Sequence, residues 1–305
     1  MDVFLQQVVN GLSLGAIYTL IALGYTMVYG VVELINFAHG DVYTLGSFFS
    51  LAILAALGVS GEVHGPALLG IVVVTIFAAM LLCGIVGVLI ERLAYRRLRN
   101  APRLAPLITA IGMSFILENV MQLWRGPSPV PFPQVIPNPG VALGGVTVTT
   151  KEGLAIVLAL GLMVALQLFI ANSKLGKAMR ATAQDREAAQ LMGINVNTTI
   201  AATFLIGSAL AGAAGFVSGV YYGTTWFFNG FQAGLKAFTA AVLGGIGNIA
   251  GAMLGGFSIG LIEAIATQYI PAGAQWSNVV VFSVLVLVLI FRPSGLLGEA
   301  LPDKV

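Results

Sequence analysis

The chain has 305 residues, of which 58% are apolar and only 9% are charged, whereas an ordinary soluble domain carries roughly 25% charged residues. It has 14 Lys and Arg against 12 Asp and Glu, a net charge of +2, and Cys83 is its only cysteine. These values exclude a disulfide-linked secreted scaffold and a disordered chain, and they disfavour nucleic-acid binding. What remains is an all-α, polytopic membrane helical bundle, with residues 1–305 forming a single transmembrane domain.

Nine apolar runs follow one another along the chain and predict the membrane crossings. They cover residues 5–30, 42–58, 66–90, 105–124, 153–172, 199–222, 233–247, 251–270 and 277–291. A helix needs about 20 residues to span a bilayer. The run 233–247 reaches only about 22 Å at 1.5 Å per residue, so we predict eight or nine spans.

Basic residues set the orientation, because cytoplasmic loops are enriched in Lys and Arg. Loops 91–104 and 173–198 hold most of them and are placed in the cytoplasm. Those residues are Arg92, Arg96, Arg97, Arg99, Arg103, Lys174, Lys177, Arg180 and Arg186. Segment 125–152 is rich in proline and predicts an extended, extracytoplasmic loop. Counting spans from there places the N-terminus outside and the C-terminal Arg292 and Lys304 inside.

Two segments differ from plain spans and carry the candidate residues of a translocation path or gate. These candidates are Glu33, Asn36, His39 and Asp41 in segment 31–41, and Lys236 near the start of the short run 233–247. Polar groups inside a membrane are costly and often mark a pathway. The alternative for each is a structural role at a helix end, at the membrane interface or between subunits. We favour Asn36 and His39 as gate residues, because they lie in a glycine-flanked break at 36–41.

Short, interrupted segments at matching places in two halves indicate an internally duplicated transporter. Residues 36–46 and 230–244 are weakly alike, and the predicted topology places them on opposite sides. An inverted repeat with short or re-entrant segments explains this likeness, and so does convergence on small residues.

A stripe of small residues runs through the sixth predicted span at every fourth position, formed by Gly207, Ala211, Gly215, Gly219 and Gly223. Such stripes let membrane helices approach closely. The sequence predicts helix packing within this chain, with a face for a partner subunit or a moving helix as the alternative.

Catalytic and metal-binding motifs are not evident. Gly256-Phe-Ser-Ile-Gly260 matches the G-x-S-x-G pattern but lies in an apolar helix rather than between a strand and a helix. His39 and His64 fall in different loops, and Cys83 lies within a span, so neither a general base nor a metal site is expected. The sequence contains no P-loop, so an ATPase that drives transport would be another chain.

The loop 173–198 is the most informative segment. Residues 177–192 are good helix formers, Gly193 predicts the end of that helix, and Asn195 can cap the next one. A short alanine-rich helix between two spans favours docking onto a partner, and an interfacial helix on the anionic leaflet is the alternative. Its candidate contacts are Arg180, Asp185, Glu187, Ala188, Ala189 and Gly193.

Glu187-Ala188-Ala189 followed by Gly193 resembles the EAA…G motif of bacterial ABC importer permeases, in which this loop forms the coupling helix seated in the ATPase. Four stretches and the ending 292–298 closely resemble the branched-chain amino acid ABC permeases, specifically the LivH-type subunit, over essentially the whole chain. The stretches are Gly-Tyr-Thr-Met-Val-Tyr-Gly (24–30), Ile-Asn-Phe-Ala-His-Gly-Asp (35–41), Met-Gly-Ile-Asn (192–195) and Lys-Ala-Phe-Thr-Ala-Ala-Val-Leu-Gly-Gly-Ile-Gly (236–247).

This resemblance implies an importer of leucine, isoleucine and valine in the bacterial inner membrane. It implies a second, LivM-type permease, two ATPase subunits that bind ATP and Mg, and a periplasmic amino-acid-binding protein, with no cofactor in this chain. It gives the coupling role to Glu187, Ala188, Ala189 and Gly193. The leucine-proline that often ends the motif elsewhere is absent, so nothing more is carried over by motif.

Three other functions remain open from the sequence. A related importer of urea or short amides would have nearly the same scaffold, because the binding protein largely imposes selectivity. An ion-driven secondary transporter would need an ion site at the midplane and no docking helix. An intramembrane enzyme would need a nucleophile and a base, which the sequence does not pair.

Overall fold

The computed structural model describes residues 2–99, 101–102, 104–143 and 145–298; Arg103 and Lys304 lie outside them. Of the described helices, seven are long and apolar enough to cross a membrane. They are α1 (Asp2–Val32), α3 (Pro66–Ile90), α4 (Leu104–Arg125), α5 (Thr150–Asn172), α8 (Val196–Tyr222), α10 (Ile249–Tyr269) and α11 (Gly273–Phe291). The second and seventh predicted runs form two shorter helices, α2 (His39–Ala56) and α9 (Asn229–Gly244). The polytopic all-α bundle is therefore confirmed.

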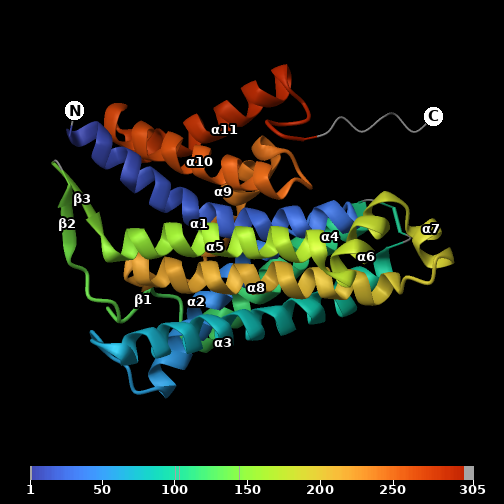
Figure 1. The fold of residues 1–305 in the computed structure, drawn as a ribbon, viewed down its shortest axis with the longest axis horizontal. Coiled ribbons are helices and arrows are strands. Elements are labelled where there is room, and N and C mark those ends of the chain that lie inside the picture. The colour runs from blue at the N-terminus through green and yellow to red at the C-terminus, as the bar shows by residue number, and fades with distance from the viewer. Residues whose placement is uncertain (1, 100, 103, 144, 299–305) are drawn as a thin grey trace.

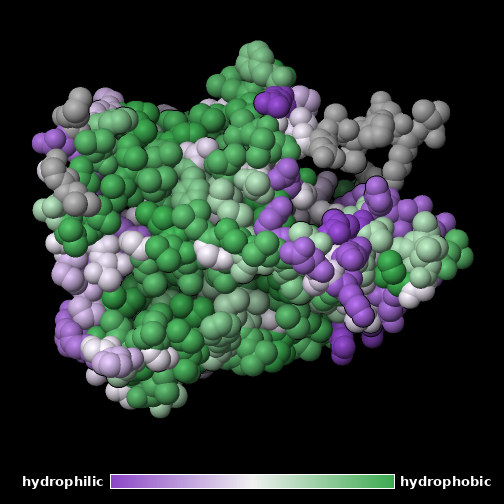
Figure 2. All heavy atoms as spheres, viewed as in Figure 1, coloured by the Kyte–Doolittle hydropathy of each residue, from purple (hydrophilic) through white to green (hydrophobic). Residues whose placement is uncertain are grey.

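Helix α1 lies at the centre, with 89% of its most apolar 18-residue stretch buried, whereas the same share is 17% in α5 and 11% in α11, which lie at the periphery. Exposed apolar side chains cover the outer helices, and Figure 2 shows them as a broad green belt between two more hydrophilic ends. A belt of this kind is what the hydrocarbon core of a bilayer covers.

One end of the bundle, here called the charged end, contains the basic loops. There α3 continues into a π-helical turn η1 (Glu91–Tyr95) and a 3₁₀ turn η2 (Arg96–Leu98), and helices α6 (Lys174–Gln184) and α7 (Arg186–Leu191) connect α5 to α8. Arg99 of the first loop donates to Asn197 Oδ1 at the start of α8, at 2.5 Å. Both basic loops therefore lie at the same end, as the span count requires.

The opposite end, here called the strand end, contains the N-terminus and the described strands (Figure 1). Strand β1 (Val130–Pro131) pairs antiparallel with β4 (Thr224–Thr225), and β2 (Gly140–Leu143) pairs with β3 (Val146–Thr149) in the register Val141↔Val148. The Gln6 side chain donates to the Thr147 carbonyl and accepts from its N–H. The proline-rich segment is extended, as predicted, because proline cannot donate inside a helix.

The short helices α2 and α9 begin inside the bundle and meet at their first turns. A Cβ on Gly40 would lie only 2.3 Å from the Gly230 carbonyl oxygen and 3.0 Å from Gly234 Cα. From there α2 runs to the strand end, where Ser47 contacts Thr225 of β4. Helix α9 runs to the charged end, where Gly244 packs on Gly251 at the start of α10. Two short helices leaving one point in opposite directions fit the re-entrant segments that the sequence predicted.

Two predicted boundaries are wrong. The break after α1 covers residues 33–38 rather than 36–41, so His39 and Asp41 belong to the first turn of α2. The predicted helix 177–192 is two helices, because Asp185 is extended (φ −154°, ψ 115°) and separates α6 from α7. A carboxylate that can bond to the backbone competes with a continuous helix, and this was the overlooked signal.

Candidate functional site

Helix α7 is a short rigid unit closed at both ends. The Asp185 carboxylate accepts from the N–H groups of Glu187 (2.8 Å) and Ala188 (3.0 Å), which caps its start. Gly193 has φ 83°, a conformation that favours glycine, and its N–H donates to the Gln190 carbonyl at 2.9 Å. Asn195 then accepts from Thr198 N–H at 3.1 Å and caps α8. The predicted stop at Gly193 and cap at Asn195 are both present.

The outer surface of α7 carries an apolar tip that sequence reasoning missed. Ala189 is buried against the bundle, whereas Glu187 and Ala188 are exposed. Leu191 and Met192 are 89% and 83% exposed. Helix α7 projects at the far edge of the charged end (Figure 1), where Figure 2 shows a small apolar patch beyond hydrophilic side chains. The position of two large apolar residues directly before Gly193 was the available signal.

Two arginines fasten this segment to the ends of membrane helices. Arg180 of α6 donates to the Ile170 carbonyl near the end of α5, and Arg186 of α7 donates to the carbonyl of Val32, the last residue of α1. Terminal helix carbonyls lack intrahelical partners, so each guanidinium satisfies an otherwise free acceptor.

Segment 33–38 and the start of α2 bring three of the predicted gate residues together in a buried position. The Tyr95 hydroxyl of η1 lies within hydrogen-bond distance of Asn36 Oδ1, at 3.2 Å. His39 Nε2–H donates to the Ile21 carbonyl at 3.2 Å, since a carbonyl can only accept. Asp41 accepts from the Ser114 hydroxyl of α4 at 2.5 Å. Glu33, by contrast, is exposed at the charged end, with φ 55°.

The His39 ring fits against α1 because residue 24 is glycine. A Cβ on Gly24 would lie 2.3 Å from His39 Nε2 and 2.7 Å from the Gly207 carbonyl. The Tyr25 ring meets the His39 ring edge to face at 4.7 Å. Helices α1, α2 and α8 therefore cross at one crowded point.

Lys236, the fifth candidate, is neutralised inside the bundle. Its ammonium contacts Glu263 Oε1 of α10 at 2.6 Å, and the Tyr18 hydroxyl donates to Glu263 Oε2 at 2.9 Å. Opposite charges with further hydrogen bonds lower the cost of burying both. This pair fixes α9 between α1 and α10.

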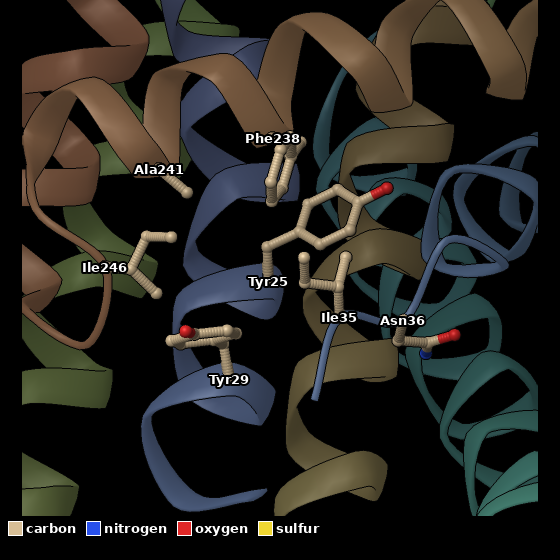
Figure 3. Close-up of a pocket in the computed structure, with 7 residues that line it drawn as sticks. All are labelled: Tyr25, Tyr29, Ile35, Asn36, Phe238, Ala241 and Ile246. Atoms are coloured by element: carbon tan, nitrogen blue, oxygen red, sulfur yellow. The ribbon is translucent and has the colours of Figure 1, made fainter. Parts of the chain in front are cut away.

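Two cavities lie near these elements. Figure 3 shows the first, an apolar recess of about 10 Å³ between Tyr25, Ile35 and Ile246, with the Asn36 amide turned away from it. The second has a volume of about 430 Å³ and lies between the ends of α1 and α5, helix α6 and the start of α10. Thr26, Gln167, Arg180 and Asn248 contribute its polar lining. His39, Asp41 and Lys236 line neither cavity in this conformation.

The predicted small-residue stripe lies against elements of this same chain. Gly207 faces Gly24 of α1, Gly215 faces the backbone of α2 at Ser47, and Gly219 faces the Phe132 ring. Ala211 is buried between them, and Gly223 ends α8 with φ 68°. Across the described part of the chain, no group of three or more His, Cys, Asp and Glu side chains could hold a metal ion.

Broken helices that meet inside a bundle of spans are a feature of membrane transport proteins, and this chain is a multi-pass protein of that class. It belongs to the family described as the permease component of branched-chain amino acid transport systems, whose family model matches residues 7–289.

Several curated relatives are similar over almost their whole length. The high-affinity branched-chain amino acid transport system permease proteins BraD of Pseudomonas aeruginosa and LivH of Escherichia coli K12 are each 44% identical, over 99% of this chain and 98% of theirs. A probable branched-chain amino acid transport permease LivH of Methanocaldococcus jannaschii is 28% identical, over 92% of this chain and 88% of its own.

Proposed function

We propose that this chain is the membrane-spanning permease subunit of a binding-protein-dependent ABC importer for leucine, isoleucine and valine. It works in the inner membrane with its charged end in the cytoplasm, so the N-terminus lies outside and the C-terminus inside. ATP and Mg bind to separate ATPase subunits, a LivM-type permease completes the pore, and a periplasmic binding protein delivers the amino acid. The similarity to BraD and LivH, at 44% identity over almost the whole chain, supports this assignment.

The main support for an ATPase contact is the exposed apolar tip of α7. Leu191 and Met192 expose large apolar surfaces at the charged end, outside the apolar belt. A buried apolar anchor in a partner's pocket contributes a large share of an interface energy. The exposed Glu187 and Ala188 adjoin this tip, while Asp185 and Gly193 hold α7 in shape, so the candidate coupling residues act as one docking unit.

The docking test replaces Met192 by serine in the assembled importer. Loss of a central apolar anchor typically costs at least 2 kcal/mol of binding free energy, so the ATPase subunits should co-purify at less than about a tenth of the wild-type amount. Leu104→Ser is the matched control, because Leu104 is an exposed apolar residue at the same end but outside the coupling segment. Equal recovery of ATPase from both variants would contradict the docking role.

The substrate and energy source need separate measurements. Uptake of labelled leucine, isoleucine and valine that unlabelled urea or short amides inhibit only weakly supports the proposal. Uptake of labelled urea or amides that the amino acids inhibit only weakly favours the amide importer. Uptake blocked by vanadate but not by a proton uncoupler supports ATP drive, whereas the opposite pattern indicates an ion-driven secondary transporter.

A further inference from the structure

One side chain ties the coupling segment directly to the backbone of the central helix. Arg186, the first residue of α7, donates through Nη2 to the Val32 carbonyl oxygen at the end of α1, 154 residues away in the sequence. A cation at a helix C-terminus is also stabilised by the helix dipole. The contact therefore satisfies the end of α1 and joins it to α7.

Val32 directly precedes the break that leads to the centre of the bundle. The chain leaves α1 through Glu33, with φ 55°, and reaches α2 at His39 through a non-helical segment. Its backbone has one turn hydrogen bond, from His39 N–H to the Asn36 carbonyl at 3.1 Å. Tyr95 holds the middle of this break through Asn36 and the Ile35 carbonyl, at 3.2 and 3.3 Å. A shift of Val32 therefore reaches α2 through a short non-helical connection.

The charges around Arg186 make its backbone partner important. Glu91 is fully buried and pairs with Arg96 at 3.2 Å and with Arg99. Among the described side chains, no carboxylate lies within ion-pair distance of Arg186. A side-chain partner could absorb a displacement by changing rotamer, whereas a carbonyl moves only with its backbone. The Arg186 contact is therefore suited to pass on movement.

Helix α7 can move as a unit. The extended Asp185 precedes it, and the left-handed Gly193 follows it, so both connections are non-helical. The Asp185 side chain caps the first turn of α7, and Arg186 belongs to that turn. A displacement of α7 would therefore move Arg186 with it.

We propose that Arg186 is a positioning residue that carries displacement of α7 to the break 33–38, and through it to α2 at the centre of the bundle. This inference rests on the proposed function, because it requires an ATPase that moves α7. It adds a specific route from the docking surface to the buried residues Asn36, His39 and Asp41.

The first experiment measures ATP hydrolysis and leucine uptake by the complete importer in proteoliposomes. Arg186→Gln removes the charge and the forked donor, and it should raise the ATP hydrolysed per leucine imported about tenfold while ATPase recovery stays at the wild-type amount. Arg186→Lys keeps a cationic donor and should restore at least half of the coupling. Arg97→Gln is the matched control, because Arg97 is exposed at the same end and has no part in this contact.

The second experiment follows movement by distance measurements between spin labels. Cys83 is the only cysteine, so Cys83→Ser provides a background for labels at the exposed positions Gln190 on α7, Leu57 after α2 and Val141 on β2. In the wild type, ATP should change both the 190–141 and the 57–141 distances. In Arg186→Gln, the 190–141 change should remain and the 57–141 change should be lost.

The outcomes separate the two proposals. The proposed function is overturned if the wild-type chain binds no ATPase subunit, or if its leucine uptake does not depend on ATP. The role of Arg186 alone is overturned if the wild type couples normally and Arg186→Gln keeps the wild-type ratio of ATP hydrolysed to leucine imported. It is also overturned if Arg186→Gln keeps the ATP-dependent change in the 57–141 distance. Failure of both Arg186 variants to assemble also overturns it, since a transmitting contact should be dispensable for assembly.

Discussion

Segments 33–38 and 223–228 both interrupt the bundle, the first before α2 and the second before α9. The second is held by backbone pairing, since Thr225 of β4 pairs with Val130 of β1, and Trp226 Nε1–H donates to the Pro127 carbonyl at 2.7 Å. The neighbouring aromatic rings of Trp226 and Phe227 pack edge to face. The first has no strand partner; Tyr95 of η1 bonds within it, and Arg186 of α7 bonds to Val32 directly before it.

Because of this difference, we expect the two breaks to differ in how far they move between transport states. Backbone pairing joins 223–228 to the strand end. Tyr95 within segment 33–38, and Arg186 at Val32 directly before it, join the other break to the charged end, where the proposed ATPase docks. We therefore expect 33–38 to move between transport states and 223–228, with α9, to act as the fixed side.

The largest expected effect comes from breaking the anchor of α9. Lys236→Met would leave the Glu263 carboxylate buried without its partner, since both side chains are less than 15% exposed. Removing one member of a buried ion pair typically costs about 3–5 kcal/mol, which a denaturant titration of the purified chain would measure. The double variant Lys236→Met/Glu263→Gln should recover most of that loss, and the exposed Lys174→Met is the control. Equal losses for the single and double variants would mean that the pair does not anchor α9.

The second effect concerns the point where the two short helices meet. Gly40→Ala would place a Cβ 2.3 Å from the Gly230 carbonyl oxygen, so α2 and α9 must separate. Overpacking of this kind costs typically about 1–3 kcal/mol, visible as a lower midpoint of thermal unfolding. Gly161→Ala in α5 is the control, because open space surrounds it and alanine favours a helix by about 1 kcal/mol. If both variants unfold at the same temperature, the close approach is not a constraint.

The smallest effects come from removing one hydrogen-bond donor at each break. Tyr95→Phe loosens segment 33–38 and Trp226→Phe loosens segment 223–228, each at a cost of about 0.5–1.5 kcal/mol. Uptake per ATP should fall for Tyr95→Phe and stay unchanged for Trp226→Phe when both assemble. A reversed result would exchange the moving and the fixed break.

Local patterns predicted several features because their causes are local. Gly193 ends α7 and Asn195 caps α8 through contacts within a few residues, and the prolines between 127 and 139 keep that stretch out of a helix. The helix break at Asp185 has an equally local cause, the carboxylate bonding to the next turn, and was missed because helix propensity outweighed it. The apolar tip at Leu191 and Met192 was missed because large apolar residues in this chain are so frequent.

The sequence by itself determined the class of protein, a range of eight or nine spans and the placement of both basic loops at one end, because hydrophobic length and charge act segment by segment. Only the tertiary structure decided what the polar residues inside the bundle contact, and what Arg186 of the coupling segment contacts. Lys236 meets Glu263 and Tyr18, His39 enters the space left by Gly24, and Arg186 reaches Val32. Each of these contacts joins residues far apart in the chain, so it depends on how the helices pack, which no local pattern encodes.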